Sequence, residues 1–187
     1  MAPEGEDGWL IVESQIVIET PHLRLRRDEI ELPSGKRIGS YYVRESRGFA
    51  VVFAITPEER IVLVRQYKHG VARVVLELPA GGLDENEDAE ACARRELAEE
   101  TGYVADAPTL EHAGTFLYDP TSSTTRYHLF LARDVTKRVP TAFDETEQID
   151  VQLATFDELR AFVRDGRIDV GAHVASVYYM LDRLGKL

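Results

Sequence analysis

The sequence "GGLDENEDAEACARRELAEETGY", residues 81–103, combines a helix pattern with a high density of negative charge. Eight of these 23 residues are Asp or Glu. Asp88 is a residue type that caps helix N-termini, and Gly102 suits the left-handed conformation that ends many helices. The good helix formers Ala and Leu recur between them. The sequence therefore predicts a helix over residues 89–101.

Three glutamates of this predicted helix share one face. Glu96, Glu99 and Glu100 stand at positions i, i+3 and i+4. Like charges at this spacing destabilise a bare helix by about 0.2–0.5 kcal/mol per pair. A hard divalent cation would reverse that penalty, because Mg²⁺ binds carboxylate and carbonyl oxygens together with water and phosphate. The alternative, a solvated acidic helix face, is favoured by composition alone.

The bulk composition indicates a folded, soluble protein. A chain of 187 residues is long enough for one well-buried core, and 44% hydrophobic with 29% charged residues is typical of globular domains. The net charge of −11 argues against a nucleic-acid partner. The single cysteine, Cys92, excludes an intramolecular disulfide. No signal peptide or membrane span is predicted, so we expect a cytoplasmic protein with no membrane partner.

The order of predicted elements indicates the fold class. β-rich runs open the chain, strands and helices mix in the middle, and helices close it. This order favours an α+β fold with a mixed sheet between helices over a regular βαβ repeat. Strands are predicted at residues 9–20, 23–33, 37–46, 48–56, 60–67, 127–135 and 148–154, and further helices at 156–166 and 170–185.

The spacing of residues around the glutamates resembles the Nudix box, a loop–helix–loop signature for hydrolases of diphosphates. The stretch "VRQYKHGVARVVLELPAGG", residues 64–82, is similar to the ADP-ribose pyrophosphatase branch of that family. The resemblance implies an α/β/α sandwich with a mixed sheet, preceded by a small antiparallel sheet. Residues 1–47 would form this N-terminal extension and dimerise, and residues 48–187 the Nudix domain. The matching positions are Gly81, Glu87, Arg95, Glu96, Leu97, Glu99, Glu100 and Gly102.

The resemblance also implies roles for single residues. Glu96 and Glu100 would bind Mg²⁺ directly with the Ala80 carbonyl, and Mn²⁺ could substitute. Glu99 would bind or bridge through water, and Arg95 would hold part of the cluster by charge-assisted hydrogen bonds. Glu87 would tie the loop to the helix, while glycines 81 and 82 allow close approach. Glu145 would be the general base with Glu147 as the alternative, and the substrate would contact Arg44, Arg65, Lys68 and Gly82.

Two departures from the pattern of this branch affect substrate specificity. Lys68 stands where an arginine is usual, so it keeps the charge but loses the bidentate fork. In "FLYDPTSSTTRYHLFLA", residues 116–132, Thr124 and Thr125 occupy the region where a carboxylate is expected. The sugar side of the substrate therefore stays open among ADP-ribose, GDP-mannose and related nucleoside diphosphate sugars.

The resemblance as a whole implies a homodimeric, Mg²⁺-dependent hydrolase. It would cleave a nucleoside diphosphate sugar, above all ADP-ribose, into a nucleoside monophosphate and a sugar phosphate. A GDP-mannose or broad nucleotide-sugar hydrolase is the nearest alternative. A Nudix-fold sensor without turnover is a second, although the complete glutamate set argues against it. The five histidines are scattered, and no pair has metal-ligand spacing.

Overall fold

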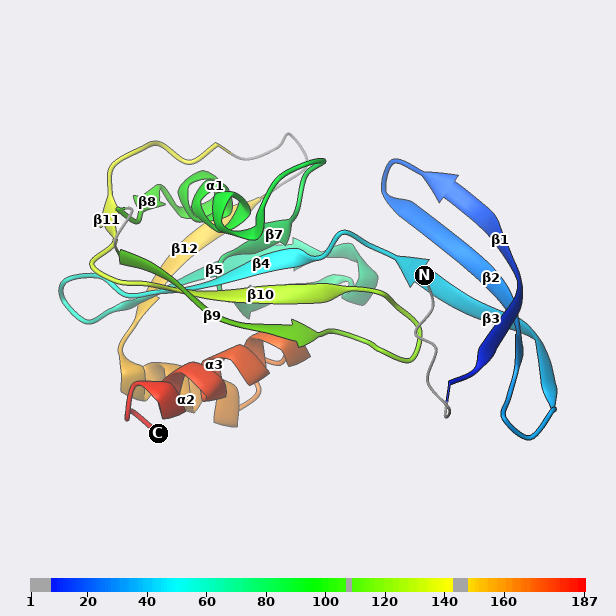
Figure 1. Cartoon of the computed structure of the whole chain (residues 1–187). Helices are drawn as coiled ribbons and strands as arrows, with labels where there is room; N and C mark the ends of the chain where they lie inside the picture. Colours follow the sequence, from blue (N-terminus) through cyan, green and yellow to red (C-terminus); the bar gives the residue numbers. More distant parts are fainter. Residues whose placement is uncertain (1–7, 107–108, 143–147) are drawn as a thin grey trace. The chain divides into compact units, whose positions relative to one another are not determined.

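The chain folds into two compact units. Figure 1 shows the whole chain, coloured by residue number. The first unit combines residues 1–48 with a later segment, 117–126. The second combines residues 49–116 and 127–187. The protein is seen here in a computed structural model that describes residues 8–106, 109–142 and 148–187.

A three-stranded antiparallel sheet forms most of the first unit. Its strands β1 (Leu10–Thr20), β2 (Leu23–Glu31) and β3 (Arg37–Glu45) lie in that order. The three strands predicted for this region are confirmed. Almost every residue of β1 is exposed, although the strand is rich in Ile and Val. Its exposed apolar side chains are Leu10, Ile11, Val12, Val17 and Ile18.

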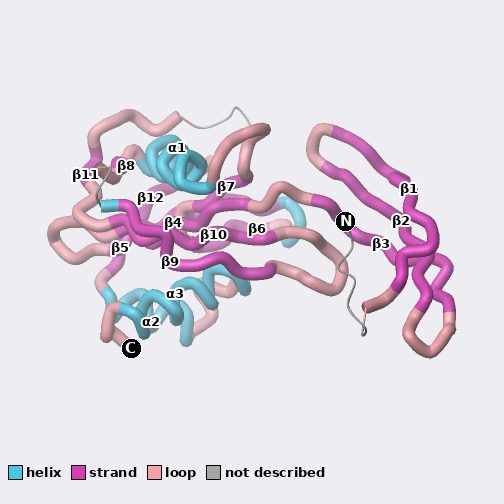
Figure 2. Tube along the Cα trace, viewed as in Figure 1, coloured by secondary structure: helices cyan, strands magenta, loops and turns pink. Residues whose placement is uncertain are grey.

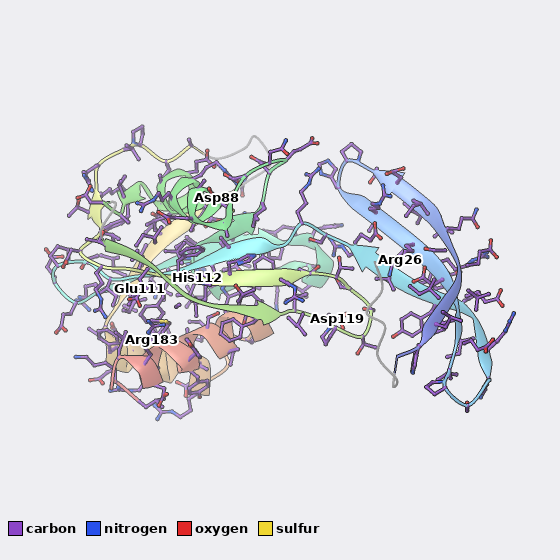
Figure 3. All side chains as sticks on the ribbon, viewed as in Figure 1. Arg26, Asp88, Glu111, His112, Asp119 and Arg183 are labelled. Atoms are coloured by element: carbon purple, nitrogen blue, oxygen red, sulfur yellow. The ribbon has the colours of Figure 1, made fainter. Side chains whose placement is uncertain are left out.

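One buried carboxylate lies inside this first unit. Asp28 is 2% exposed and accepts hydrogen bonds from Arg26 Nε at 2.9 Å and Ser14 Oγ at 2.7 Å. Arg26, labelled in Figure 3, also donates from Nη1 to Glu45 at 2.7 Å. These bonds tie β1, β2 and β3 together, because Ser14 lies on β1, Arg26 and Asp28 lie on β2, and Glu45 lies on β3.

The second unit contains a mixed sheet, as predicted. A four-stranded sheet has the order β7-β4-β10-β9, and its two central strands run parallel. A three-stranded antiparallel sheet has the order β12-β5-β6. A two-stranded ladder of β8 and β11 completes the unit. The strands are β4 (Phe49–Ala54), β5 (Ile61–Lys68), β6 (Arg73–Glu77), β7 (Ala80–Gly82), β8 (Tyr103–Val104), β9 (Leu110–Leu117), β10 (Arg126–Ala132), β11 (Thr136–Lys137) and β12 (Ile149–Ala154).

Helices cover the strands of the second unit from two sides. Helix α1 (Ala89–Thr101) lies on one side, and α2 (Phe156–Arg164) and α3 (Gly171–Arg183) lie on the other (Figures 1 and 2). Neighbouring strand residues point to opposite faces, so Val52 packs in the core with α1 and Phe53 in the core with α2 and α3. The α/β/α layering is confirmed. No helix among the described residues is both long and apolar enough to cross a membrane.

Some strands lack a clear signal in the sequence. The predicted strands and helices form within a few residues of their predicted bounds, but β6, β7 and β9 and the two-residue strands β8 and β11 were not predicted. β7 is three residues long, contains two glycines and follows Pro79. β9 mixes His, Gly and Thr with apolar residues, so it shows no strict alternation. Pairing with β4 makes β7 a strand, pairing with β10 makes β9 a strand, and pairing with β5 makes β6 a strand.

Candidate active site

Helix α1 begins and ends where the sequence predicts. The Asp88 side chain (labelled in Figure 3) accepts a hydrogen bond from the Ala91 amide at 2.8 Å. Gly102 has φ 75°, and its amide donates to the Ala98 carbonyl at 2.8 Å. These local bonds satisfy backbone groups that a helix end leaves open. They fix the 13-residue helix that carries the glutamates.

Arg95 forms hydrogen bonds with three carboxylates of the site. Its Nε and Nη2 each lie 2.8 Å from one oxygen of Glu87, which is a bidentate pair. Its Nη1 donates to Glu96 at 2.6 Å and to Glu99 at 3.2 Å. The hydrogen bonds from Arg95 lower the pKa of Glu87 to about 2. Glu87 also accepts from the Asp84 amide at 3.0 Å, so it ties the loop to the helix as predicted.

Glu100 is the buried member of the cluster. It is 4% exposed, whereas the side chain of Glu99 is 43% exposed. Its Oε2 accepts a hydrogen bond from the Ala80 amide at 3.0 Å. Burial raises the pKa of Glu100 to about 8, and the charge of Glu96 acts in the same direction. The three glutamates share a helix face but differ in depth, with Glu100 deepest.

Ala80 and Gly81 of strand β7 lie directly against Glu100 and Glu96. A Cβ atom at Gly81 would lie 2.0 Å from Cδ of Glu96, so only glycine permits this contact. A Cβ atom at Gly82 would meet nothing within 4 Å. The buried Cys92 thiol donates to the carbonyls of both glycines at 3.4 Å. Burial raises its pKa to about 12, so Cys92 is a packing residue rather than a nucleophile.

The donor set of this site fits a hard divalent cation. The Glu100 carboxylate lies at the Ala80 amide and the Glu96 carboxylate lies against Gly81, while Glu99 shares their helix face, and all of these ligand atoms are oxygens. The buried Glu100 carboxylate lacks a cationic hydrogen-bond partner in the described part of the chain. A divalent ion would supply that charge. Within the described ranges, no three acidic, His or Cys side chains already converge on one point, because Arg95 draws Glu96 and Glu99 towards itself.

The predicted substrate cations lie in different surroundings. Lys68 forms an ion pair with Glu77 at 2.9 Å, and its charge lowers the pKa of Glu100 against the effect of burial. Arg65 is exposed, and strand alternation places it on the opposite face of β5 from Lys68. Arg44 is exposed on β3 and belongs to the first unit. Glu145 and Glu147 lie outside the described residues.

The unusual threonine pair is part of the first unit. The Thr124 amide donates to the Arg44 carbonyl at 3.0 Å, and its Oγ1 accepts from the Ser46 amide at 3.1 Å. Thr125 is buried, and its hydroxyl lies 2.5 Å from that of Ser123. These bonds hold residues 117–126 beside β3, so the threonines fix the backbone that carries Arg44.

The sequence analysis missed two buried polar residues of the second unit. Glu77 and His173 are 4% and 5% exposed, and His173 Nε2 lies 3.3 Å from Glu77 Oε2. His173 gave no signal, because it has no partner at a metal-ligand spacing. Glu77 lies in the "ELPAG" stretch, so the resemblance marked its position without giving it a role.

Comparison with known families identifies the chain. The NUDIX domain family matches residues 45–173, which is more than half of the sequence. The chain belongs to the Nudix family. Residues 9–43 match a second family, described as the nucleoside diphosphate sugar hydrolase N-terminal domain. Both matches agree with the resemblance drawn from the glutamate spacing and the residues upstream of it.

Similar proteins extend over most of this Nudix chain. The methanol dehydrogenase activator of Bacillus methanolicus is 35% identical over 159 residues, 84% of each protein. The ADP-ribose pyrophosphatase of Bacillus subtilis strain 168 is 31% identical over 157 residues, 82% of each. A solved structure of an ADP compounds hydrolase has a TM-score of 0.83 at 18% identity, covering 99% of this chain and 100% of the other, which shows a shared fold. The chain is a Nudix hydrolase.

Proposed function

We propose that this Nudix hydrolase cleaves the diphosphate of ADP-ribose or a related nucleoside diphosphate sugar, with Mg²⁺, into a nucleoside monophosphate and a sugar phosphate. The observation that carries the proposal is the glutamate face of α1, which lies against Ala80 and Gly81 of strand β7. The resemblance to an ADP-ribose pyrophosphatase over 82% of the chain supports the substrate class.

The proposed metal ligands are the Glu96 and Glu100 carboxylates and the Ala80 carbonyl, with Glu99 bound directly or through water. When bound, Mg²⁺ offsets the charge of the diphosphate oxygens and lowers the pKa of a bound water, and Mn²⁺ can replace it. Gly81 leaves room for the Glu96 carboxylate. Arg95 orients Glu96 and Glu99 through its hydrogen bonds, which makes it part of the proposed catalytic group.

The remaining proposed roles concern the proton and the substrate. Glu145 takes the proton of the attacking water, with Glu147 as the alternative base. Lys68 is proposed to hold the diphosphate, with Arg44 and Arg65 as further candidates for substrate contact, and the Gly82 backbone borders the substrate. Lys68 acts as a point charge on one phosphate, because it lacks the arginine fork.

The exposed strand β1 supports the proposal of a homodimer through residues 1–47. Leu10 is 63% exposed, and Ile11, Val12 and Ile18 are each more than 40% exposed. Apolar side chains gathered along a sheet edge favour pairing with a second copy. Light scattering of the wild type should give twice the chain mass, and Val12→Glu should shift the distribution towards monomer. A monomeric wild type would contradict the dimer.

Two other functions stay distinct from this proposal. The first alternative is a hydrolase of GDP-mannose or of a broad set of nucleotide sugars. The Thr124–Thr125 pair supports it, because these residues stand where ADP-ribose pyrophosphatases are expected to carry a carboxylate. A Nudix-fold sensor would bind such a ligand without cleaving it. Its divalent site would then serve binding only, so Glu100→Gln would change affinity without any turnover to lose.

The deciding experiment identifies products by mass spectrometry in H₂¹⁸O. ADP-ribose, GDP-mannose and UDP-glucose are each incubated with Mg²⁺ and, separately, with EDTA. Mg²⁺-dependent AMP and ribose 5-phosphate, with ¹⁸O in one of them, would establish ADP-ribose cleavage and identify the attacked phosphorus. Preference for another sugar would correct the substrate. Binding of all three without cleavage would favour the sensor.

A further inference from the structure

A buried carboxylate and a buried imidazole face each other where β6 ends. Glu77 closes β6, and His173 lies in the first turn of α3. Both side chains are at least 94% excluded from solvent. Burying a carboxylate costs free energy unless it is paired and hydrogen-bonded. The bonds that these two residues make therefore indicate what the pair holds in place.

Hydrogen-bond donors fix the form of His173. The Leu78 amide donates to Nδ1 at 3.2 Å, so Nδ1 carries no proton. The proton of the neutral ring therefore lies on Nε2, which faces Glu77 Oε2 at 3.3 Å. Burial, followed by the charge of Lys68, lowers the pKa of His173 to about 3, which keeps the ring neutral. Nδ1 thus accepts a hydrogen bond from Leu78 while Nε2 faces Glu77.

The other oxygen of Glu77 holds Lys68. Lys68 Nζ lies 2.9 Å from Glu77 Oε1, and its side chain is 41% exposed, so the ammonium group reaches solvent. The same charge acts on Glu100. Glu77 thus links an inner imidazole to an outer cation beside the glutamate face. Without His173, the inner oxygen of Glu77 would lose this partner.

The Leu78 amide links His173 to strand β7, which faces the glutamates. Pro79 follows, and its fixed φ makes the segment stiff. The Pro79 carbonyl accepts from the Val52 amide at 2.9 Å, and the Ala80 amide donates to Glu100 at 3.0 Å. Residues 78–80 are therefore held successively by α3, β4 and α1. A shift at Leu78 would move the Ala80 backbone relative to Glu100.

We propose that His173 is a positioning residue of the active site. Through Glu77 it positions Lys68, and through the Leu78 amide it positions the Ala80 backbone. The inference rests on the proposed function for the roles of Lys68 and Ala80. It assigns to α3 a part in the reaction, although this helix lies on the opposite side of the strands from α1 (Figure 1).

The test compares two substitutions of His173. His173→Leu removes the hydrogen bond from the Leu78 amide and the contact of Nε2 with Glu77, whereas His173→Gln keeps an acceptor for Leu78 and an N–H group that can face Glu77. We expect the Leu variant to lose about 10- to 100-fold in kcat at a temperature where it is folded, because small displacements of reacting groups cost that much. The Gln variant should recover most of the loss. Equal kcat for wild type and the Leu variant would overturn the proposal.

Ser176→Ala is the matched control. Ser176 is 1% exposed in the same helix, and its hydroxyl donates to the Ala172 carbonyl at 2.7 Å. This variant should lower Tm without lowering kcat, which separates loss of stability from loss of positioning. If the control and the Leu variant lose the same fraction of kcat, His173 acts only on stability.

Two readouts do not depend on turnover. Nitrogen chemical shifts of the His173 ring should show the neutral Nε2–H form at pH 7, and a proton on Nδ1 would overturn the inference. The affinity for Mn²⁺, measured by electron paramagnetic resonance, should be lower in His173→Leu than in the wild type and unchanged in Ser176→Ala. Equal Mn²⁺ affinity of the wild type and His173→Leu would contradict the proposed link between His173 and the Ala80 backbone. Absence of turnover by the wild type overturns the proposed function alone, since these readouts still decide the positioning role.

Discussion

The acidic face of α1 and the buried pair under α3 stabilise negative charge in different ways. Arg95 binds Glu87, Glu96 and Glu99, all within eight residues of it, and the cluster stays open to solvent. Glu77 is paired with His173 from a helix almost a hundred residues later in the chain, and both are buried. On the proposed function, the open cluster would exchange Arg95 contacts for a cation, whereas the buried pair would only hold position.

Glu100→Gln should give the largest effect and tests whether the acidic face of α1 is catalytic. The amide keeps the size of the side chain but removes the charge that a cation needs. We expect kcat to fall by roughly 10³-fold or more, since metal stabilisation contributes several kcal/mol. Steady-state kinetics on the best substrate measures the loss, and circular dichroism checks the fold. Glu90→Gln, on the exposed side of α1, is the control and should keep wild-type activity.

Gly81→Ala should break the open cluster sterically. The added Cβ would lie 2.0 Å from the Glu96 carboxyl carbon, and the flexible end of Glu96 must move away. We expect about 100-fold lower kcat with a small change in Tm, because displacement of a reacting group costs that much. Gly82→Ala meets open space, so any loss should appear in KM. Equal kcat losses for both variants would contradict this difference.

Acid should reduce the free energy of unfolding, because His173 is buried in its neutral form. The pKa of His173 is about 3 in the folded chain against 6.5 when unfolded. Only the unfolded chain binds this proton below pH 6.5, so the contribution is complete above pH 6.5 and is lost as pH falls towards 3. Between pH 6.5 and 5 the free energy of unfolding should drop by at most about 2 kcal/mol.

Urea unfolding of wild type and His173→Gln at both pH values measures this contribution. The charged groups that face His173, Glu77 and Lys68, are present in both proteins. Burial raises the pKa of Glu77, and its opposing effect on acid stability therefore cancels in the comparison. The glutamine variant should show the smaller pH dependence. Parallel curves for the two proteins would show that His173 does not titrate on unfolding.

Arg95→Lys should give the smallest loss and tests the fork that holds the open cluster. Lysine keeps the charge but cannot contact Glu87 bidentately while also reaching Glu96. We expect kcat to fall roughly tenfold, as for loss of one charged hydrogen bond. Arg94→Lys is the matched control, since Arg94 pairs with the exposed Glu90 at 2.9 Å. Kinetics of both variants at saturating Mg²⁺ decide whether geometry or charge matters.

The predictions from sequence succeeded where the determining contacts are local. Helix α1 follows from Asp88, Gly102 and the alanines between them, all read within 15 residues. Strands β6, β7 and β9 were missed, because their pairing partners rather than their own patterns define them. The partnership of residues 117–126 with Arg44 was missed for the same reason: backbone hydrogen bonds between distant segments leave no periodicity.

The sequence by itself determined the helix, the spacing of its glutamates and membership of the Nudix family. Helical geometry fixes which residues share a face, so Glu96, Glu99 and Glu100 could be grouped without a structure. Periodicity does not give depth. Only the tertiary structure placed Glu100 in the interior on the Ala80 amide, left Glu99 exposed, and brought His173 to Glu77 and Leu78. Burial and long-range hydrogen bonds depend on how distant elements pack, and this packing decided the environment of each carboxylate.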